Sequence, residues 1–332
     1  MLKTRWAIVG TGYIAHEFAS GMQIVKDAEL TAVVSRSEET GKRFAAEYDC
    51  RKVYTELQAM LDSENVDAVY LAIPNDCHYS YIMTALDAGA AVLCEKPMVD
   101  NRRQLDRVIA KAKEKNVFLM EGMWTRCFPA IIQARDWIGE GKIGEVLAVR
   151  SGFDIKPDVN DWQPWKGGIL HGGGALRDVG IYALAMAYMA FPENPEAVYS
   201  TMKSNGEVDE SFHMMMTYPG GKAAFLSGAF NQVSTPWTEI TGEKGRIQIG
   251  PQFWHPTTAR LILNNEEREE FVQEYPASGF QYEIQAVQDC IRSGKTECAH
   301  FTLEETAKIS DMIEKARKEW GILYQSDEVE EV

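Results

Sequence analysis

The alternation of short apolar runs with helical stripes over the first 120 residues constrains the fold more than any other feature of the sequence. Runs that are apolar along their whole length are typical of strands buried on both faces, as in a parallel sheet covered by helices. The sequence therefore predicts an α/β domain with a doubly wound parallel sheet over residues 1–122. Stretches with apolar residues three and four apart separate the apolar runs, which recur at residues 6–9, 30–34, 66–73, 90–94 and 117–120.

Residues 123–332 show a different pattern. From residue 197 onward, strand-like runs follow one another without helical stripes between them, and Gly220-Gly221 stands between two of them as a hairpin signal. Consecutive strands of this kind imply an antiparallel sheet, so we predict a second, α+β domain with a mostly antiparallel open sheet. Its strand-like runs lie at residues 145–153, 197–204, 212–218, 223–231, 237–241 and 246–249, and its helices at residues 129–139, 281–292 and 303–320.

The strands between residues 212 and 230 carry large apolar side chains on more faces than one core can hide. Exposed apolar surface of this kind usually marks an interface between subunits. The sequence therefore predicts a homodimer that forms through the sheet of the second domain.

The net charge restricts the partners of the chain. Its 332 residues contain 34 Lys and Arg against 49 Asp and Glu, a net charge of −15, which repels nucleic acid and anionic lipid. No apolar run approaches the roughly 20 residues that span a bilayer. The cysteines form no C-x-x-C pair and the histidines no H-E-x-x-H motif, so no metal site is expected. We expect a cytoplasmic protein with reduced thiols.

The first apolar run leads directly into a glycine-rich turn, Gly10-Thr-Gly12-Tyr13-Ile14-Ala15, and then into a helical stripe. In dinucleotide-binding folds the first glycine makes the tight turn and the second lets the pyrophosphate approach the backbone, while the small last residue allows close packing of helix on strand. The helix N-terminus then offers N–H groups and a partial positive charge to the pyrophosphate. This context predicts a dinucleotide site, and a tight turn without a ligand is the alternative.

The end of the second predicted strand indicates which dinucleotide binds. NAD sites usually place Asp or Glu there to accept a hydrogen bond from the ribose 2′-hydroxyl, whereas NADP sites place Arg near the 2′-phosphate. Here the segment is Ser35-Arg36-Ser37, without an acid. Arg36 can pair with the phosphate and stack on adenine, and the two serines can donate hydrogen bonds. We therefore predict NADP rather than NAD, with a solvated surface role for Arg36 as the alternative.

Further candidates follow the fourth and fifth predicted strands, at the sheet edge where ligands bind in doubly wound folds. Lys96 lies where the nicotinamide is expected, and a surface ion pair is its alternative role. His78 is expected to form a hydrogen-bonding part of the wall rather than to carry a proton. Along the cofactor we place Ile73, Pro74, Asn75, His78, Glu95, Lys96 and Pro97.

A second glycine run, residues 172–174, precedes a helix that carries Asp178 and Tyr182. The glycines allow close approach of another segment or a ligand, and the four-residue spacing puts the two side chains on one helical face. Together with the first glycine turn and Glu95-Lys96-Pro97, this helix start resembles the glucose–fructose oxidoreductase/inositol dehydrogenase (Gfo/Idh/MocA) family. The resemblance covers essentially the whole chain.

Within that family the chain is most similar to the dihydrodiol dehydrogenase branch, through residues 121–129 and through Tyr182, where many sugar and inositol members carry histidine. The resemblance implies an oxidoreductase that uses NADP and acts on a sugar-like or cyclic diol, such as a trans-dihydrodiol or an aldose like xylose. It also implies that a phenol, in place of an imidazole, transfers the proton.

Oxidation of a secondary alcohol requires that the hydroxyl proton leave, and Tyr182 is the predicted acid–base residue. An unperturbed phenol titrates near pH 10, and the Lys96 ammonium is expected to favour the phenolate and to hold the reacting oxygen. Asp178 is expected to bind a second substrate hydroxyl or to orient Lys96. The alternatives are a core tyrosine at position 182 and a helix N-terminal carboxylate at position 178.

Three residues are candidates for substrate contacts. Trp124 and Phe153 could form an aromatic wall, with core packing as an equal alternative. Arg126 could bind a substrate oxygen or pair with an acid.

Three functions remain open at this point. The first is an NADP-dependent oxidoreductase, the second is an enzyme that retains its cofactor and transfers hydride between two sugars, and the third is a non-catalytic NADP-sensing or interaction protein on the same fold. The presence of both Lys96 and Tyr182 favours an enzyme, because a sensor needs neither residue.

Overall fold

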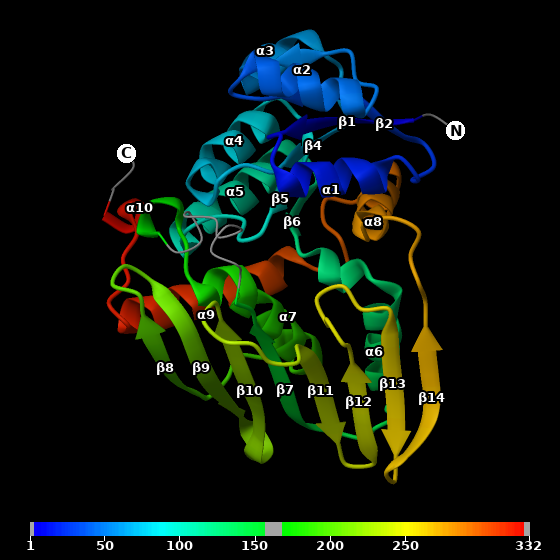
Figure 1. The fold of residues 1–332 in the computed structure, drawn as a ribbon, viewed down its shortest axis with the longest axis vertical. Helices are drawn as coiled ribbons and strands as arrows, with labels where there is room; N and C mark the ends of the chain where they lie inside the picture. Colours follow the sequence, from blue (N-terminus) through cyan, green and yellow to red (C-terminus); the bar gives the residue numbers. More distant parts are fainter. Residues whose placement is uncertain (1–2, 157–167, 329–332) are drawn as a thin grey trace. The chain divides into compact units, whose positions relative to one another are not determined.

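The computed structural model describes residues 3–156 and 168–328, and the chain divides into two compact units (Figure 1). Unit 1 combines Met1–Trp124 with Tyr275–Leu303, and unit 2 combines Thr125–Glu274 with Glu304–Val332. All six cysteines lie within the described residues, and none of them forms a disulfide. Within the described residues, no helix is both long enough and apolar enough to cross a membrane.

Unit 1 is built on a six-stranded parallel sheet with the strand order β3-β2-β1-β4-β5-β6. The order reverses between β1 and β4, which is the position where doubly wound sheets bind ligands. This architecture confirms the predicted parallel α/β domain. The strands are β1 (Thr4–Val9), β2 (Ala28–Val34), β3 (Val53–Tyr54), β4 (Ala68–Leu71), β5 (Ala91–Glu95) and β6 (Leu119–Gly122), and the helices are α1 (Tyr13–Met22), α2 (Glu38–Glu47), α3 (Leu57–Ser63), α4 (Asn75–Asp87) and α5 (Arg102–Lys115).

Helix α8 (Phe280–Arg292) belongs to unit 1 although it lies far along the chain. The ring of Phe280 contacts Phe18 of α1 and Tyr70 of β4, with centroid distances of 5.8 and 6.5 Å. The predicted division after residue 122 assigns this segment to the second domain. The segment packs in unit 1 instead, because Phe280 completes an aromatic cluster in which Phe18 stacks on Tyr70 at 3.6 Å.

Unit 2 is built on an eight-stranded sheet with the order β14-β13-β12-β11-β7-β10-β9-β8, in which only the β7–β10 pair is parallel. This confirms the mostly antiparallel sheet and the hairpin at Gly220-Gly221. Strands β13 and β14 lie outside the predicted strands, since the edge strand β14 is largely charged and lacks apolar alternation. The strands are β7 (Val146–Asp154), β8 (Ala197–Ser204), β9 (Asp209–Tyr218), β10 (Lys222–Ala229), β11 (Trp237–Gly242), β12 (Gly245–Ile249), β13 (Thr258–Leu263) and β14 (Glu266–Val272).

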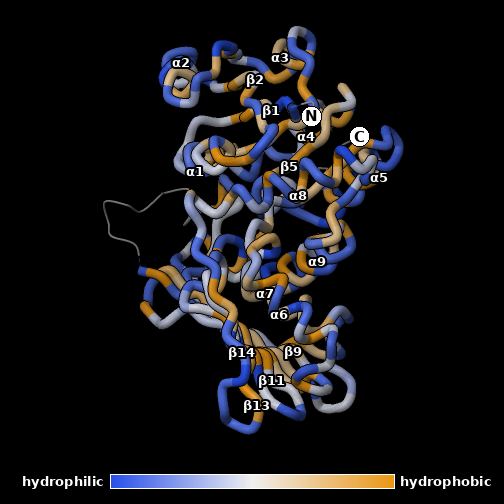
Figure 2. Tube along the Cα trace, turned by 90° about the vertical axis from the view of Figure 1, so that its right-hand side faces the viewer, coloured by the Kyte–Doolittle hydropathy of each residue, from blue (hydrophilic) through white to orange (hydrophobic). Residues whose placement is uncertain are grey.

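One face of this sheet is covered by helix α7 (Ile181–Ala190), which packs on β7, β10 and β11 and is buried along its whole length. Figure 2 shows the apolar character of α7 in contrast with the largely hydrophilic α5. The opposite face, here called the open sheet face, includes the cross-strand neighbours Tyr199, Met215, Phe225, Arg150 and Glu239. The other helices of unit 2 are α6 (Pro129–Gly139), α9 (Leu303–Glu319) and α10 (Gln325–Glu328).

Candidate functional site

The glycine turn after β1 leaves the start of α1 open. Gly10 has a φ of +102°, and a Cβ atom there would lie 2.1 Å from the Ala72 carbonyl oxygen, so only glycine fits. Gly12 is the N-cap of α1 and makes no side-chain cap hydrogen bond. A Cβ atom on Gly12 would meet nothing within 4 Å. The N–H groups in the first turn of α1 are therefore accessible to an anion.

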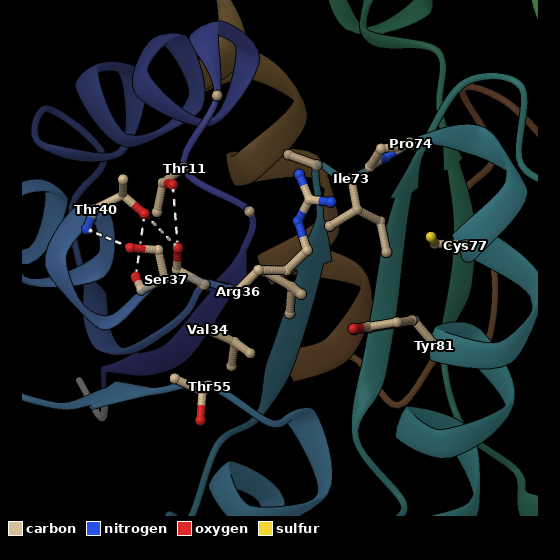
Figure 3. A pocket seen from close by; sticks show the side chains of 15 residues that line it. Thr11, Val34, Arg36, Ser37, Thr40, Thr55, Ile73, Pro74, Cys77 and Tyr81 are labelled. Atoms are coloured by element: carbon tan, nitrogen blue, oxygen red, sulfur yellow. Dashed lines mark hydrogen bonds between the residues drawn. The ribbon is translucent and has the colours of Figure 1, made fainter. Parts of the chain in front are cut away.

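A pocket of about 560 Å³ in unit 1 begins at this turn and extends across the ends of β1, β2 and β4 (Figure 3). Arg36 extends from the loop after β2 toward Ile73, and Tyr81 on α4 reaches into the same space. Among the described residues that line the pocket, Arg36 is the only charged one. The lining residues are Val9, Gly10, Thr11, Gly12, Val34, Ser35, Arg36, Ser37, Thr40, Thr55, Ala72, Ile73, Pro74, Cys77 and Tyr81.

The pocket contains most of the residues expected near the pyrophosphate and the 2′-phosphate. Tyr13 and Ile14 follow the turn in α1, are 75% and 38% exposed and do not line the pocket, so their contact with the cofactor stays a prediction. Ala15 is buried beneath the helix. The predicted residues that line the pocket are Gly10, Gly12, Ser35, Arg36, Ser37, Ile73 and Pro74.

Hydroxyl groups shape the loop that presents Arg36. The buried Ser35 Oγ lies 2.8 Å from Thr40 Oγ1 and 3.4 Å from Thr11 Oγ1. Ser37 caps α2 by accepting a hydrogen bond from the Thr40 N–H at 3.4 Å. Since Ser37 accepts in this cap, its own hydroxyl hydrogen can still be donated to an anion. Ser35 holds the loop, whereas Ser37 and Arg36 are exposed.

Eight lining residues are additional to the predicted set. Cys77 lies three residues after Pro74, and Tyr81 lies four residues after Cys77. This helical spacing is the sequence signal that identifies them. Burial raises the pKa of the Tyr81 hydroxyl, and the charge of Arg36 opposes the rise. Tyr81 therefore presents a protonated hydroxyl to the pocket. The additional residues are Val9, Thr11, Val34, Thr40, Thr55, Ala72, Cys77 and Tyr81.

His78 is fully buried and does not line the pocket. Its Nδ1 lies 3.0 Å from the Pro97 carbonyl oxygen and its Nε2 lies 3.0 Å from the Ile73 carbonyl oxygen. The imidazole thus joins the segment after β4 to the segment after β5. This position fits a hydrogen-bonding role, and direct contact of His78 with a cofactor stays a prediction, as it does for Asn75.

Lys96 follows β5 at the carboxyl edge of the sheet and is half-buried. The preceding Glu95 accepts a hydrogen bond from the Tyr70 hydroxyl at 2.5 Å and another from the Lys96 N–H at 3.3 Å. Because Tyr70 is fully buried, the Glu95 side chain anchors the backbone at Lys96 to the core of unit 1.

In unit 2, Asp178 and Tyr182 lie on one continuous helical segment, in which the π-helical turn η4 (Leu176–Gly180) leads directly into α7. The ring of Tyr182 lies 5.8 Å from that of Phe153 at the end of β7. Phe153 in turn stacks on Trp254 at 3.8 Å with an interplanar angle of 11°. The structure thus brings two predicted residues together and adds Trp254, whose loop lies outside every predicted element.

Two other predicted substrate residues have partners within their own units. Trp124 of unit 1 stacks on Phe280 at 4.5 Å. Arg126 of unit 2 is 3% exposed, and its guanidinium donates hydrogen bonds to Glu305 at 2.6 Å and to the Ala185 carbonyl oxygen at 3.0 Å. For Arg126 this is the pairing with an acid that the sequence leaves open as the alternative.

The fold and the open glycine turn define a dinucleotide-binding protein. The oxidoreductase family with an NAD-binding Rossmann fold (GFO_IDH_MocA) matches residues 4–123, and the GFO/IDH/MocA C-terminal domain matches residues 131–248. The chain belongs to the Gfo/Idh/MocA family and is an NAD(P)-dependent oxidoreductase.

Named relatives match nearly the whole chain. The trans-1,2-dihydrobenzene-1,2-diol dehydrogenase of Sus scrofa is 30% identical over 342 residues, covering 97% of this chain and 98% of the relative. An aldose-aldose oxidoreductase from Caulobacter crescentus has a TM-score of 0.84 at 26% identity, covering 96% of this chain and 98% of the other. A 3-ketoreductase from Actinomadura kijaniata, in complex with NADP and TDP-benzene, has a TM-score of 0.83 at 26% identity, covering 95% and 97%. These similarities confirm the resemblance seen in the sequence.

Proposed function

We propose that this protein is an NADP-dependent oxidoreductase that transfers hydride between the cofactor and a secondary alcohol or carbonyl of a sugar-like or cyclic diol. The observation that carries the proposal is the open start of α1 in a pocket whose one charged lining residue is Arg36. The substrate class is supported by the names of the relatives, which are a dihydrodiol dehydrogenase, an aldose-aldose oxidoreductase and a ketoreductase.

The residues of unit 1 fit NADP. The backbone at Gly10 and Gly12 would hold the pyrophosphate at the helix start, where a side chain at position 10 would clash. Arg36 would pair with the 2′-phosphate, assisted by the Ser37 hydroxyl, and no carboxylate among the described lining residues opposes that charge. When bound, the nicotinamide supplies the hydride acceptor for oxidation and the donor for reduction.

The remaining chemistry belongs to the side chains. During oxidation the carbinol C–H bond breaks with its electron pair, the hydroxyl proton passes to the Tyr182 phenolate, and a carbonyl forms. Lys96 holds the reacting oxygen and stabilises the phenolate, and Asp178 binds a second hydroxyl of the diol. The ring of Phe153 lies near Tyr182 and stacks on Trp254, and this aromatic pair would border the ring of the substrate.

A screen for turnover tests this proposal. Purified protein is assayed for NADP reduction with trans-1,2-dihydrobenzene-1,2-diol, D-xylose and myo-inositol, and for NADPH oxidation with the matching carbonyls. We expect turnover with at least one diol or aldose, and a higher kcat/KM for NADP than for NAD. Absence of turnover in both directions, with NADPH binding intact, would favour the sensing protein instead.

An enzyme that retains its cofactor and transfers hydride between two sugars is the second candidate, and the similarity to an aldose-aldose oxidoreductase favours it. The absorbance spectrum of the desalted protein separates the two. A nicotinamide band that persists through desalting indicates retained cofactor, and its loss indicates release at each turnover.

The open sheet face supports a homodimer. Tyr199 and Phe225 are 60% and 42% exposed on it, and the guanidinium of Arg150 lies 5.6 Å from the centre of the Phe225 ring. A second copy that covers this face would remove the exposed rings from water. Light scattering at micromolar concentration should give a dimer, and Phe225→Glu should give a monomer. A monomeric wild-type protein would contradict the proposed homodimer.

A further inference from the structure

The helix that carries Asp178 and Tyr182 is capped from a distant strand. Ala175 precedes its first turn and has no side chain that could cap it, but Asp209 at the start of β9 supplies the acceptor. Asp209 Oδ2 accepts a hydrogen bond from the Leu176 N–H at 2.6 Å, and the Ala175 N–H also bonds to this carboxylate. Gly174 provides the room, because a Cβ atom there would lie 2.3 Å from Asp209 Oδ1.

A residue near the C-terminus of unit 2 also binds the backbone of the turn at residues 173–176. The Tyr324 hydroxyl donates a hydrogen bond to the Gly173 carbonyl oxygen at 2.8 Å. The ring of Tyr324 lies against the guanidinium groups of Arg177 and Arg317, at 4.8 and 4.4 Å from its centre. Asp327 fixes this arrangement, since it accepts from Arg317 at 2.6 and 2.8 Å and from the Tyr324 N–H at 2.9 Å.

Close packing on the sheet removes the remaining freedom of the segment. A Cβ atom on Gly180 would lie 2.4 Å from the Phe212 ring, and a Cβ atom on Gly228 would lie 2.5 Å from the same ring. Phe212 of β9 is therefore enclosed between the helix start and β10. The segment from residue 173 to residue 180 is held by the Asp209 carboxylate, by the Tyr324 hydroxyl and by the sheet.

We propose that Asp209 and Tyr324 are positioning residues for proton transfer, because together they clamp the turn at residues 173–176 from which the helix carries Asp178 and Tyr182. The inference rests on the proposed function, in which Tyr182 transfers the proton. Neither residue needs to touch the substrate. Each acts by fixing the origin of the helix, and displacement of a catalytic group by about 1 Å can cost about 100-fold in rate.

Two variants and a matched control test the clamp. Asp209→Asn replaces one of the two side-chain oxygens that can accept the backbone N–H groups by an NH2 group, and Tyr324→Phe removes only the donor to Gly173. The control is Glu210→Gln on the same strand, because the Glu210 carboxylate pairs with Lys203 at 2.8 Å and not with the helix start. Hydrogen exchange is followed for peptides that cover residues 172–182, and kcat and KM are measured with NADP and either trans-1,2-dihydrobenzene-1,2-diol or D-xylose.

We expect Asp209→Asn to speed exchange at residues 175–176 by about tenfold or more and to lower kcat by about tenfold, with the KM for NADP within about twofold of the wild type. Tyr324→Phe should act in the same direction by about two- to fivefold, and it carries the test if Asp209→Asn fails to fold. The Glu210→Gln control should match the wild type in every measurement.

Unchanged exchange in both variants would overturn the clamp. Faster exchange with an unchanged kcat would overturn the positioning role. If the wild-type protein turns over neither substrate, the proposed function is overturned, and the clamp is not. Hydrogen exchange at residues 175–176 in the variants would in that case still show whether Asp209 caps the helix.

Discussion

Two glycine-rich turns open the two helices on which this protein depends, and they differ in what satisfies the helix start. In unit 1, Gly12 caps α1 without a side chain, and a Cβ atom there would enter empty space. In unit 2, a Cβ atom on Gly174 would collide with Asp209, whose carboxylate accepts the N–H of Leu176. The first turn is open to an external anion, whereas the second is closed by a carboxyl group that the protein itself supplies.

This difference shows how similar sequence signals lead to different roles. Glycine at a helix start lets another group come close to the backbone, and the identity of that group decides the role of the turn. At Gly12 that group is the proposed pyrophosphate, and at Gly174 it is a side chain from a neighbouring strand. In the proposed function, the first turn therefore binds the cofactor and the second aligns Tyr182, the proposed acid–base residue.

The largest expected effect is a loss of kcat, without a loss of cofactor affinity, when the hydroxyl of Tyr182 is removed. Tyr182→Phe keeps the ring and removes the hydroxyl, so kcat should fall by about 10²–10⁴-fold while NADPH affinity stays unchanged. Lys96→Met should lower kcat comparably, and the double variant should be far less than additive if the two groups act as one unit. Steady-state kinetics and NADPH fluorescence titration give both numbers. Near-normal turnover of Tyr182→Phe would assign proton transfer to another group.

A smaller effect is expected on the preference for NADP over NAD in the pocket at the first turn. Arg36→Asp exchanges the 2′-phosphate partner for a repelling carboxylate and should move discrimination toward NAD by about 1–3 kcal/mol, the range for charge-assisted hydrogen bonds. The measurement is the ratio of kcat/KM for NADP and NAD. An unchanged ratio would show that Arg36 is only a surface residue.

The last prediction concerns the pH dependence of protein stability that Asp209 causes at the second turn. Burial raises the pKa of Asp209 from 3.8 to about 7, against the opposing effect of the backbone hydrogen bonds and Arg177. The stabilisation from this group is therefore full below pH 4 and is lost as pH rises to about 7. Asp209→Asn lacks this loss, so the stability of the wild type relative to the variant should fall as the pH rises from 4 to 7.

Urea denaturation of both proteins at several pH values from 4 to 8 measures this difference. The buried Glu283, whose pKa is also raised by burial, is present in both proteins and cancels in the comparison. A difference that stays constant across this range would show that Asp209 does not titrate there.

The parts of the fold that the sequence predicts are those with local signals. The strand, glycine turn and helix of the first site lie within residues 4–22, and the doubly wound pattern repeats every few tens of residues. Arg36, which lines the pocket, is predicted in the same way because it closely follows an apolar strand, and Lys96 after β5 stays a prediction. The spacing of Cys77 and Tyr81 along α4 carries a comparable signal.

The parts that escape prediction depend on contacts between distant segments. Phe280 packs against Phe18 across more than two hundred residues of sequence, and Asp209 reaches Leu176 across 33. Neither contact has a local signature, since an Asp at a strand start resembles any other surface carboxylate. Arg126 is ambiguous for the same reason, because its partner Glu305 lies 179 residues away.

The most direct test of the difference between the two turns is to make the first resemble the second. Gly12 has φ −83° and ψ −178°, the extended conformation that an Asp N-cap adopts, so Gly12→Asp should fold and cap α1 with its own carboxylate. The measurement is NADPH affinity by fluorescence titration, with Gly12→Ala as the control. We predict that Gly12→Asp weakens binding by at least about 30-fold, or about 2 kcal/mol, and that Gly12→Ala, which adds a Cβ atom near the pyrophosphate but no charge, weakens it clearly less than Gly12→Asp does. Binding of NADPH by Gly12→Asp within threefold of the wild type would contradict the assignment of the open helix start to the cofactor.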